Sequence, residues 1–121
     1  MKKFGEILKT QEQEFAKEKH MPIIDSPDKV KKDQFFEVTI TIGKEVPHPN
    51  TIEHHIKWIQ VFAEMDGRAP IQVGLFDFGP TFADPKVTIK IKLEKTANIF
   101  ALEYCNIHGV WENMKKIEVE E

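Results

Sequence analysis

The chain has 121 residues, of which 40% are hydrophobic and 31% are charged, and its formal net charge is -3. This length suits one folded unit with a sizeable core, so we expect a single domain over residues 1–121. The negative charge, with no basic stripe of interleaved aromatic residues to offset it, argues against a nucleic-acid-binding protein.

The chain contains one cysteine, Cys105, which cannot form a disulfide within the molecule. Nothing in the composition therefore indicates an oxidising compartment. Charged residues interrupt the segment after Met1, where a signal peptide needs an apolar run, and no stretch is long enough to cross a bilayer. These features predict a cytoplasmic protein that is neither exported nor inserted into a membrane.

The N-terminal segment has apolar residues at helical spacing, at Phe4, Ile7, Leu8 and Phe15. This spacing predicts a short amphipathic helix or turn in roughly the first fifteen residues. Pro22 and Pro27 prevent its continuation. From Phe36 to Ile42 the period changes to two, which predicts a half-buried strand that ends before Gly43.

Further strands are predicted at residues 55–65, 71–78, 87–93, 98–104 and, near the C-terminus, 117–119. Turn signals separate them, among them Asp66-Gly67-Arg68-Ala69-Pro70 and Gly79-Pro80. The acidic residues 118–121 are interpreted as a solvated tail. Short strands with frequent turns predict an all-β fold, an immunoglobulin-like antiparallel β-sandwich with a short N-terminal helix or turn.

The residues able to bind a metal fall into three clusters. His20 stands alone, His48 is followed closely by His54 and His55, and Cys105-Asn106-Ile107-His108-Gly109 holds a cysteine and a histidine three residues apart. A single histidine or cysteine is usually a structural residue, but clustering raises the probability of a metal site. Loops at the ends of strands can meet at one rim of a sandwich.

The number of ligands bears on the metal. His54 and His55 cannot both point at one centre if a strand has begun, because successive side chains leave opposite faces. One thiolate with up to four imidazoles exceeds the four ligands of a closed zinc site and suits redox-active iron or copper. A zinc site with one cysteine and three histidines, and a spare histidine, stays open on these grounds.

Three motifs in this order resemble superoxide reductase of the single-domain neelaredoxin type, in the desulfoferrodoxin iron-binding family. They are Glu18-Lys19-His20-Met21-Pro22, the stretch from Gly43 to Ile56 that contains His48-Pro49-Asn50 and Glu53-His54-His55, and the stretch Tyr104-Cys105-Asn106-Ile107-His108-Gly109-Val110-Trp111-Glu112. The resemblance spans nearly the whole chain.

The resemblance implies one mononuclear iron centre with four imidazole ligands and an axial thiolate, from His20, His48, His54, His108 and Cys105. It further implies that Glu18 binds the ferric iron and that Lys19 attracts the anionic substrate and assists protonation, whereas His55 is not a ligand. The backbone amides of Ile107 and His108 are candidates to donate hydrogen bonds to the thiolate.

The implied reaction is the one-electron reduction of superoxide to hydrogen peroxide without release of dioxygen. An external donor such as rubredoxin would return the iron from Fe3+ to Fe2+, and the neelaredoxin type implies a homotetramer. Three alternatives remain at this stage. They are a binding module with a structural zinc, an electron carrier with a shielded centre, and a dismutase side activity.

Overall fold

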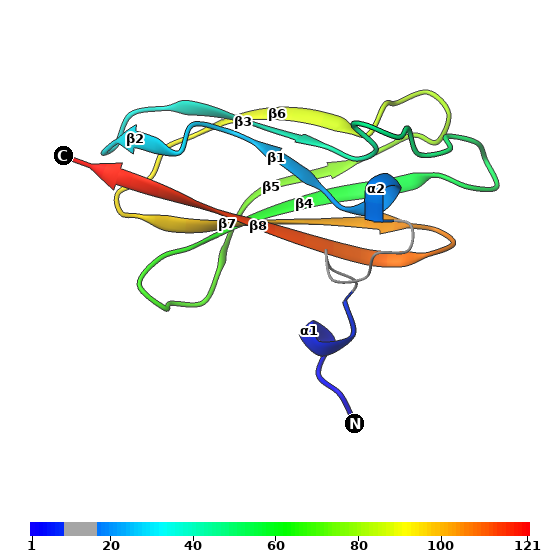
Figure 1. Cartoon of the computed structure of the whole chain (residues 1–121), viewed down its shortest axis with the longest axis horizontal. Helices are drawn as coiled ribbons and strands as arrows, with labels where there is room; N and C mark the ends of the chain where they lie inside the picture. The colour runs from blue at the N-terminus through cyan, green and yellow to red at the C-terminus, as the bar shows by residue number, and fades with distance from the viewer. Residues whose placement is uncertain (9–16) are drawn as a thin grey trace.

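Two β-sheets form the body of the computed structural model, which describes residues 1–8 and 17–121. They lie face to face, with strand orders β1-β3-β6 and β2-β8-β7-β4-β5 (Figure 1). The elements are α1 Phe4–Ile7, α2 Lys17–His20, β1 Ile23–Asp25, β2 Lys29–Lys31, β3 Phe36–Thr41, β4 Ile56–Glu64, β5 Ile71–Asp77, β6 Lys86–Ile91, β7 Ala97–Cys105 and β8 Gly109–Glu120. The prediction of an immunoglobulin-like β-sandwich with a short N-terminal helix is confirmed.

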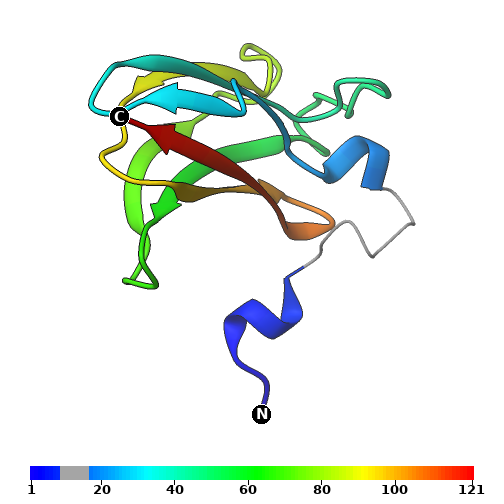
Figure 2. The same ribbon diagram turned by 60° about the vertical axis from the view of Figure 1, so that its left-hand side comes forward.

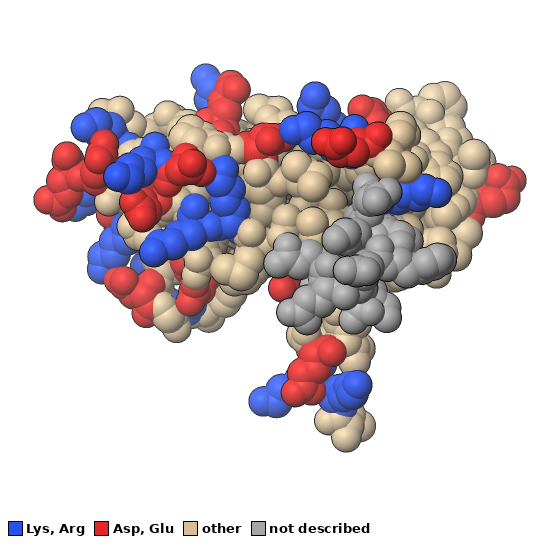
Figure 3. All heavy atoms as spheres, viewed as in Figure 1, with Lys and Arg blue, Asp and Glu red and all other residues tan. Residues whose placement is uncertain are grey.

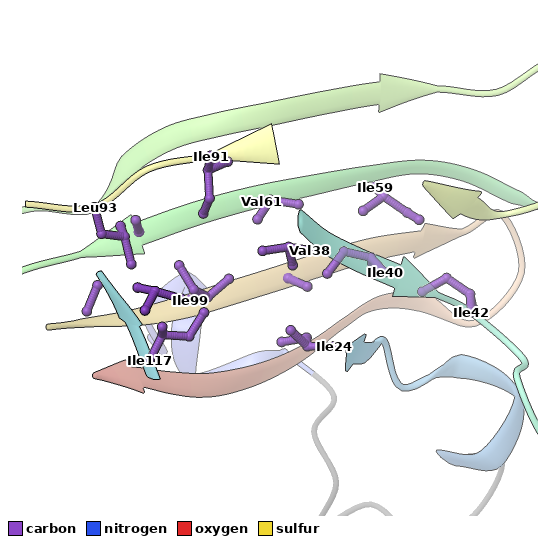
Figure 4. Close-up of a cluster of buried hydrophobic side chains, with 14 of the residues drawn as sticks. Ile24, Val38, Ile40, Ile42, Ile59, Val61, Ile91, Leu93, Ile99 and Ile117 are labelled. Carbon is purple, nitrogen blue, oxygen red and sulfur yellow. The ribbon is translucent and has the colours of Figure 1, made fainter. Parts of the chain in front are cut away.

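The core fills the space between the two sheets (Figure 4). Every second residue of β7 is buried, namely Ala97, Ile99, Ala101, Glu103 and Cys105. Alternate side chains of a strand leave opposite faces, so all five belong to one face. Val38 and Ile40 of β3, in the opposite sheet, have no exposed surface. The same alternation that builds the core therefore carries Cys105 into the interior at the end of β7.

The strands expected at residues 36–42, 55–65, 71–78, 87–93 and 98–104 correspond to β3, β4, β5, β6 and β7. Two strands, β1 and β2, were not predicted, because three residues are too few to show a period of two. The last strand begins at Gly109 rather than near Ile117. Part of the expected N-terminal helix lies outside the described residues.

The acidic C-terminus is not a solvated tail, and this prediction was wrong. Glu118, Val119 and Glu120 belong to β8 and pair in parallel with β2. Lys29 lies 3.8 Å from Glu118 and Lys31 lies 3.5 Å from Glu120, although all four side chains are largely exposed. Charged side chains of both signs crowd this end of the molecule (Figure 3). Exposed pairs of this kind contribute little, so backbone pairing holds the strand.

The opposite end of the sandwich gathers α2, the loop before β4 and the turn between β7 and β8 (Figures 1 and 2). These three segments carry the predicted ligands His20, His48, His54, Cys105 and His108. Within the described part of the chain, no helix has the length and apolar character needed to cross a membrane.

Candidate metal centre

Four of the predicted ligands converge at this end of the sandwich. One potential ligand atom each from His20, His54, Cys105 and His108 lies within 4.8 Å of all the others. The fifth, His48, joins them through His20, because the Nε2 atoms of the two rings are 3.2 Å apart. The Nδ1 atom of His108 is also 3.2 Å from Nε2 of His20. The structure thus gathers His48 beside the cluster of the other four residues.

The turn after β7 shapes the cysteine side of the cluster. The backbone N–H of His108 donates a hydrogen bond of 3.3 Å to Sγ of Cys105. Burial raises the pKa of the Cys105 thiol, while hydrogen bonds from the N–H groups of His108 and Ile107 oppose that rise by favouring the thiolate. The predicted hydrogen bond from the N–H of His108 to the sulfur is therefore confirmed, and the N–H of Ile107 acts on the thiol pKa in the same direction.

His48 is held by a loop that begins with a tight turn at Gly43, whose φ is +76°. A Cβ atom at Gly43 would lie 2.5 Å from the backbone nitrogen of His48, so only glycine fits there. The Nδ1 of His48 is 2.7 Å from the carbonyl oxygen of Pro49, which can only accept, so Nδ1 carries the proton. Burial lowers the pKa of His48 to about 4. Its Nε2 therefore presents a bare lone pair at neutral pH.

His54 and His55 have separate roles, as the sequence predicted. Nε2 of His54 is buried and has no hydrogen-bond partner. Burial is the largest cause that lowers the His54 pKa, followed by the charges of His108, His55 and Lys19. The ring of His55 instead places Nδ1 3.0 Å from the carbonyl oxygen of Thr51. His54 thus faces the cluster with a free nitrogen, and His55 braces the loop.

Asn106 connects two of the ligand-bearing segments, a role that the sequence did not indicate. Its Oδ1 accepts a hydrogen bond of 2.8 Å from the backbone N–H of His55, and its Nδ2 donates one of 2.9 Å to the carbonyl of Glu53. The side chain lies in the Cys105–His108 turn, so these bonds fix that turn against the loop that carries His54. The only available signal was its place between two candidate ligands.

Trp111 packs on the inner side of the cluster. Its ring stacks on that of His20 with the centroids 4.9 Å apart. Trp111 is therefore in direct contact with a candidate ligand. A flat aromatic wall limits the orientations that the His20 ring can take.

The two charged residues before His20 lie in α2. Lys19 is exposed, and its positive charge is one of the causes that lower the His54 pKa, so the ammonium group acts on the cluster. The backbone of Glu18 belongs to the same helix, but its side chain lies outside the described part of the structure. The predicted contact of Glu18 with a metal therefore stays a prediction.

The donor set fits one metal ion. Ligand nitrogens about 2.1 Å from a metal and at right angles to each other lie about 3.0 Å apart, close to the two observed separations of 3.2 Å. An ion at this point would also provide the missing partner of the buried His54 Nε2. Four imidazoles and one thiolate form a nitrogen-rich site of the kind that suits redox iron. Fold and site together define a β-sandwich protein with a candidate metal centre of histidines and one cysteine.

Comparison with known proteins identifies the family. The desulfoferrodoxin family model matches residues 12–114. A superoxide reductase of Thermococcus kodakarensis is 42% identical over 84% of this chain and 89% of its own, and a neelaredoxin of Megalodesulfovibrio gigas is 38% identical over 85% and 89%. A solved superoxide reductase (neelaredoxin) from Ignicoccus hospitalis has a TM-score of 0.90 and 41% identity, covering 98% of this chain and all of the other.

The chain therefore belongs to the desulfoferrodoxin family, and within it to the superoxide reductases of the neelaredoxin type, which are oxidoreductases. The predicted resemblance is confirmed. The family and the cluster of histidines with one cysteine together indicate an iron site.

Proposed function

We propose that the chain reduces superoxide to hydrogen peroxide at one iron ion held by five residues, His20, His48, His54, Cys105 and His108. The observation that carries the proposal is the cluster of three ring nitrogens and one sulfur within 4.8 Å of one another, with Nε2 of His48 3.2 Å from that of His20. The reaction consumes one superoxide, one electron and two protons and yields one hydrogen peroxide. Iron bound there supplies the one-electron chemistry between Fe2+ and Fe3+.

The chain's own residues prepare the site for an anion. Neutral imidazoles leave the centre positively charged, since the pKa values of His48 and His54 are both lowered. Lys19 adds an exposed ammonium group to this local field, which opposes the overall charge of -3. Focused positive charge raises the rate at which a small anion reaches a site. We assign Lys19 to attraction of superoxide and to protonation, and Glu18 to the ferric iron, as the resemblance implies.

The exposed ring of His108 leaves one side of the cluster open to solvent, whereas Cys105, His20 and His48 are buried. This arrangement favours an enzyme over a carrier with a shielded centre, because a substrate must reach the metal. It also disfavours a purely structural zinc, which closes its coordination with four ligands.

The reaction also requires an electron donor, and the chain an assembly and a place in the cell. An external carrier such as rubredoxin would return the electron, since the one cysteine of this chain already belongs to the iron site. We further propose that residues 1–121 act as one iron-binding domain, that the chain assembles as a homotetramer and that it works in the cytoplasm.

The visible spectrum of iron-loaded protein tests the centre. Oxidation by one electron is expected to produce an absorption band from the thiolate of Cys105 to Fe3+, and Cys105→Ser should remove it. Peroxide should then form from superoxide in a one-to-one ratio without dioxygen. A protein that is fully loaded with iron but shows no such band would refute the proposed centre.

Lys19→Ala tests the attraction of the anion. The second-order rate with superoxide should fall several-fold to about tenfold, and its dependence on ionic strength should weaken. Lys90→Ala, an exposed lysine on β6, is the matched control and should leave the rate unchanged. Equal rates for Lys19→Ala and the wild type at low salt would remove Lys19 from the mechanism.

A further inference from the structure

The first eight residues hold apolar side chains that the described structure leaves uncovered. The α1 helix has four residues and none of them is buried. Phe4 is 63% exposed and Ile7 is 56% exposed. A helix this short is not stable by itself in water. In both ribbon views it stands away from the sandwich (Figures 1 and 2).

This segment precedes the residues that the family model matches. The family model begins at residue 12, so residues 1–8 are not needed to define the iron-binding fold. An apolar helical turn at this position calls for a partner surface, because exposed apolar side chains gathered in one place commonly mark contacts.

An apolar groove lies on the outer face of the five-stranded sheet. It has a volume of about 370 Å³ and is lined by Phe62, Pro70, Phe100, Leu102 and Glu112. The loop between β4 and β5 contributes Pro70 and hangs below the sheet on the same side as α1 (Figure 1). Burial raises the pKa of the Glu112 carboxyl, as expected for an acid among apolar neighbours.

The segment and the groove match in chemistry. The segment offers Phe4 and Ile7 beside the positive charges of Lys2 and Lys3, and the groove offers aromatic and aliphatic walls beside one acid, Glu112. The lining residues place the groove on the outer face of the five-stranded sheet, and α1 stands off from the sandwich on that side (Figures 1 and 2). Two copies that face each other with these sides can therefore each place the segment over the other's groove.

We propose that residues 1–8 of one copy dock in this groove on a second copy, with Phe4 and Ile7 against Phe62, Phe100 and Leu102 and the lysines near Glu112. This contact would form one of the interfaces of the proposed homotetramer, and it rests on that proposal. Specific interfaces bury about 1,200–2,000 Å² in total, more than two short segments supply. The exposed Met114 of β8 and Leu75 of β5 provide further apolar area in the same sheet.

Sedimentation equilibrium of the iron-loaded protein tests the contact. The double variant Phe4→Asp with Ile7→Asp, and the deletion of residues 1–8, should both form smaller assemblies than the wild type. Phe82→Asp is the matched control, since Phe82 is 95% exposed in a loop away from the groove. Circular dichroism should show unchanged strand content in all of them. Wild-type mass in both N-terminal variants would overturn the docking proposal.

A photo-reactive benzoylphenylalanine in place of Phe4 distinguishes the possible occupants of the groove. A cross-link at twice the chain mass, mapped to the peptide that contains Phe100 and Leu102, is the expected result. A cross-link within one chain would overturn the proposal, because residues 1–8 would then occupy the groove of their own chain. A monomeric wild type would overturn both this contact and the homotetramer, whereas the superoxide assay on the same sample reports on the proposed reaction separately.

Discussion

Glu103 is a carboxylic acid in the middle of the core. It has no exposed surface, and neither carboxyl oxygen has a hydrogen-bond partner in the described structure. Burial raises its pKa to about 9, so the carboxyl group stays protonated at neutral pH. It shares a face of β7 with Cys105, two residues further along the strand. The charge that Glu103 gains above its own pKa is one of the causes that raise the pKa of the Cys105 thiol.

Glu103→Gln should remove a pH dependence of stability. The folded pKa is higher than the unfolded value, so the stabilising contribution of the proton is complete below about pH 4.5 and is lost as the pH rises towards 9. Between pH 6 and 9, metal-free wild-type protein should lose on the order of a few kcal/mol of unfolding free energy, and the glutamine variant should lose much less. Urea unfolding at pH 6 and pH 9 measures the unfolding free energy of both proteins. Equal losses in the wild type and in Glu103→Gln would contradict the raised pKa of Glu103.

Gly43→Ala should weaken metal binding by tenfold or more. The new Cβ would collide with the backbone nitrogen of His48 and push that ligand out of position. Gly67→Ala is the matched control, since its φ of +67° imposes similar backbone strain while its Cβ would meet open space. Gly67→Ala should lose about 1–2 kcal/mol of stability from backbone strain alone, and Gly43→Ala should lose more because of the collision. Only Gly43→Ala should lose affinity in a metal titration. Unchanged affinity in Gly43→Ala would show that the loop adapts.

At the scale of elements, β7 is the central support of the site. It pairs with β4 on one side and with β8 on the other, and its last residue is Cys105. The turn from β7 to β8 contains His108, and the segment just before β4 contains His54. Neighbouring strands of one sheet therefore set the relative positions of three candidate ligands.

Ile99→Ala should cost about 2–5 kcal/mol of unfolding free energy. Ile99 has no exposed surface and lies in the core cluster, so its truncation leaves a cavity that the packed sheets cannot fill. Lys116→Ala on the adjacent β8 is the control, because that exposed side chain should change stability by less than about 0.5 kcal/mol. Denaturant unfolding of both variants provides the comparison. Similar losses of unfolding free energy in Ile99→Ala and Lys116→Ala would contradict the placement of Ile99 in a tightly packed core.

At the scale of the whole molecule, the candidate metal centre joins segments that are far apart in the chain. His20 of α2 precedes the first sheet strands, whereas Cys105 and His108 lie near the C-terminus. A metal bound by residues from both ends of the chain would link them in the folded state only. The unfolded chain has no preformed site for it. An ion bound by these residues would therefore stabilise the entire fold.

Removal of the metal should lower the melting temperature. At a free metal concentration a hundred times the Kd, binding stabilises the folded state by about 2.7 kcal/mol, which corresponds to about 10 °C for a chain of this size. Calorimetry of iron-loaded and chelated protein measures the difference, and Cys105→Ser should reduce it. Identical melting temperatures with and without bound metal would argue against a site that couples these segments.

Local patterns in the sequence predicted much of this molecule. Alternation of apolar and polar residues from Phe36 to Ile42 predicted β3, because one face of that strand is buried. Such reasoning did not find β1 and β2, each of three residues, because their pairing depends on distant partner strands. The acidic end was misread for the same reason, since its partner β2 lies about ninety residues earlier in the chain.

Sequence alone determined the type of fold through its local patterns, and the resemblance of three motifs to a known family supplied the family and the five candidate ligands. Only the tertiary structure decided which nitrogen each histidine turns inward, that Asn106 ties the two ligand loops, and that Glu103 lies uncharged near the sulfur. It also revealed the open groove beside β4, β7 and β8. These properties arise from contacts between residues far apart in the chain, and no local pattern encodes such contacts.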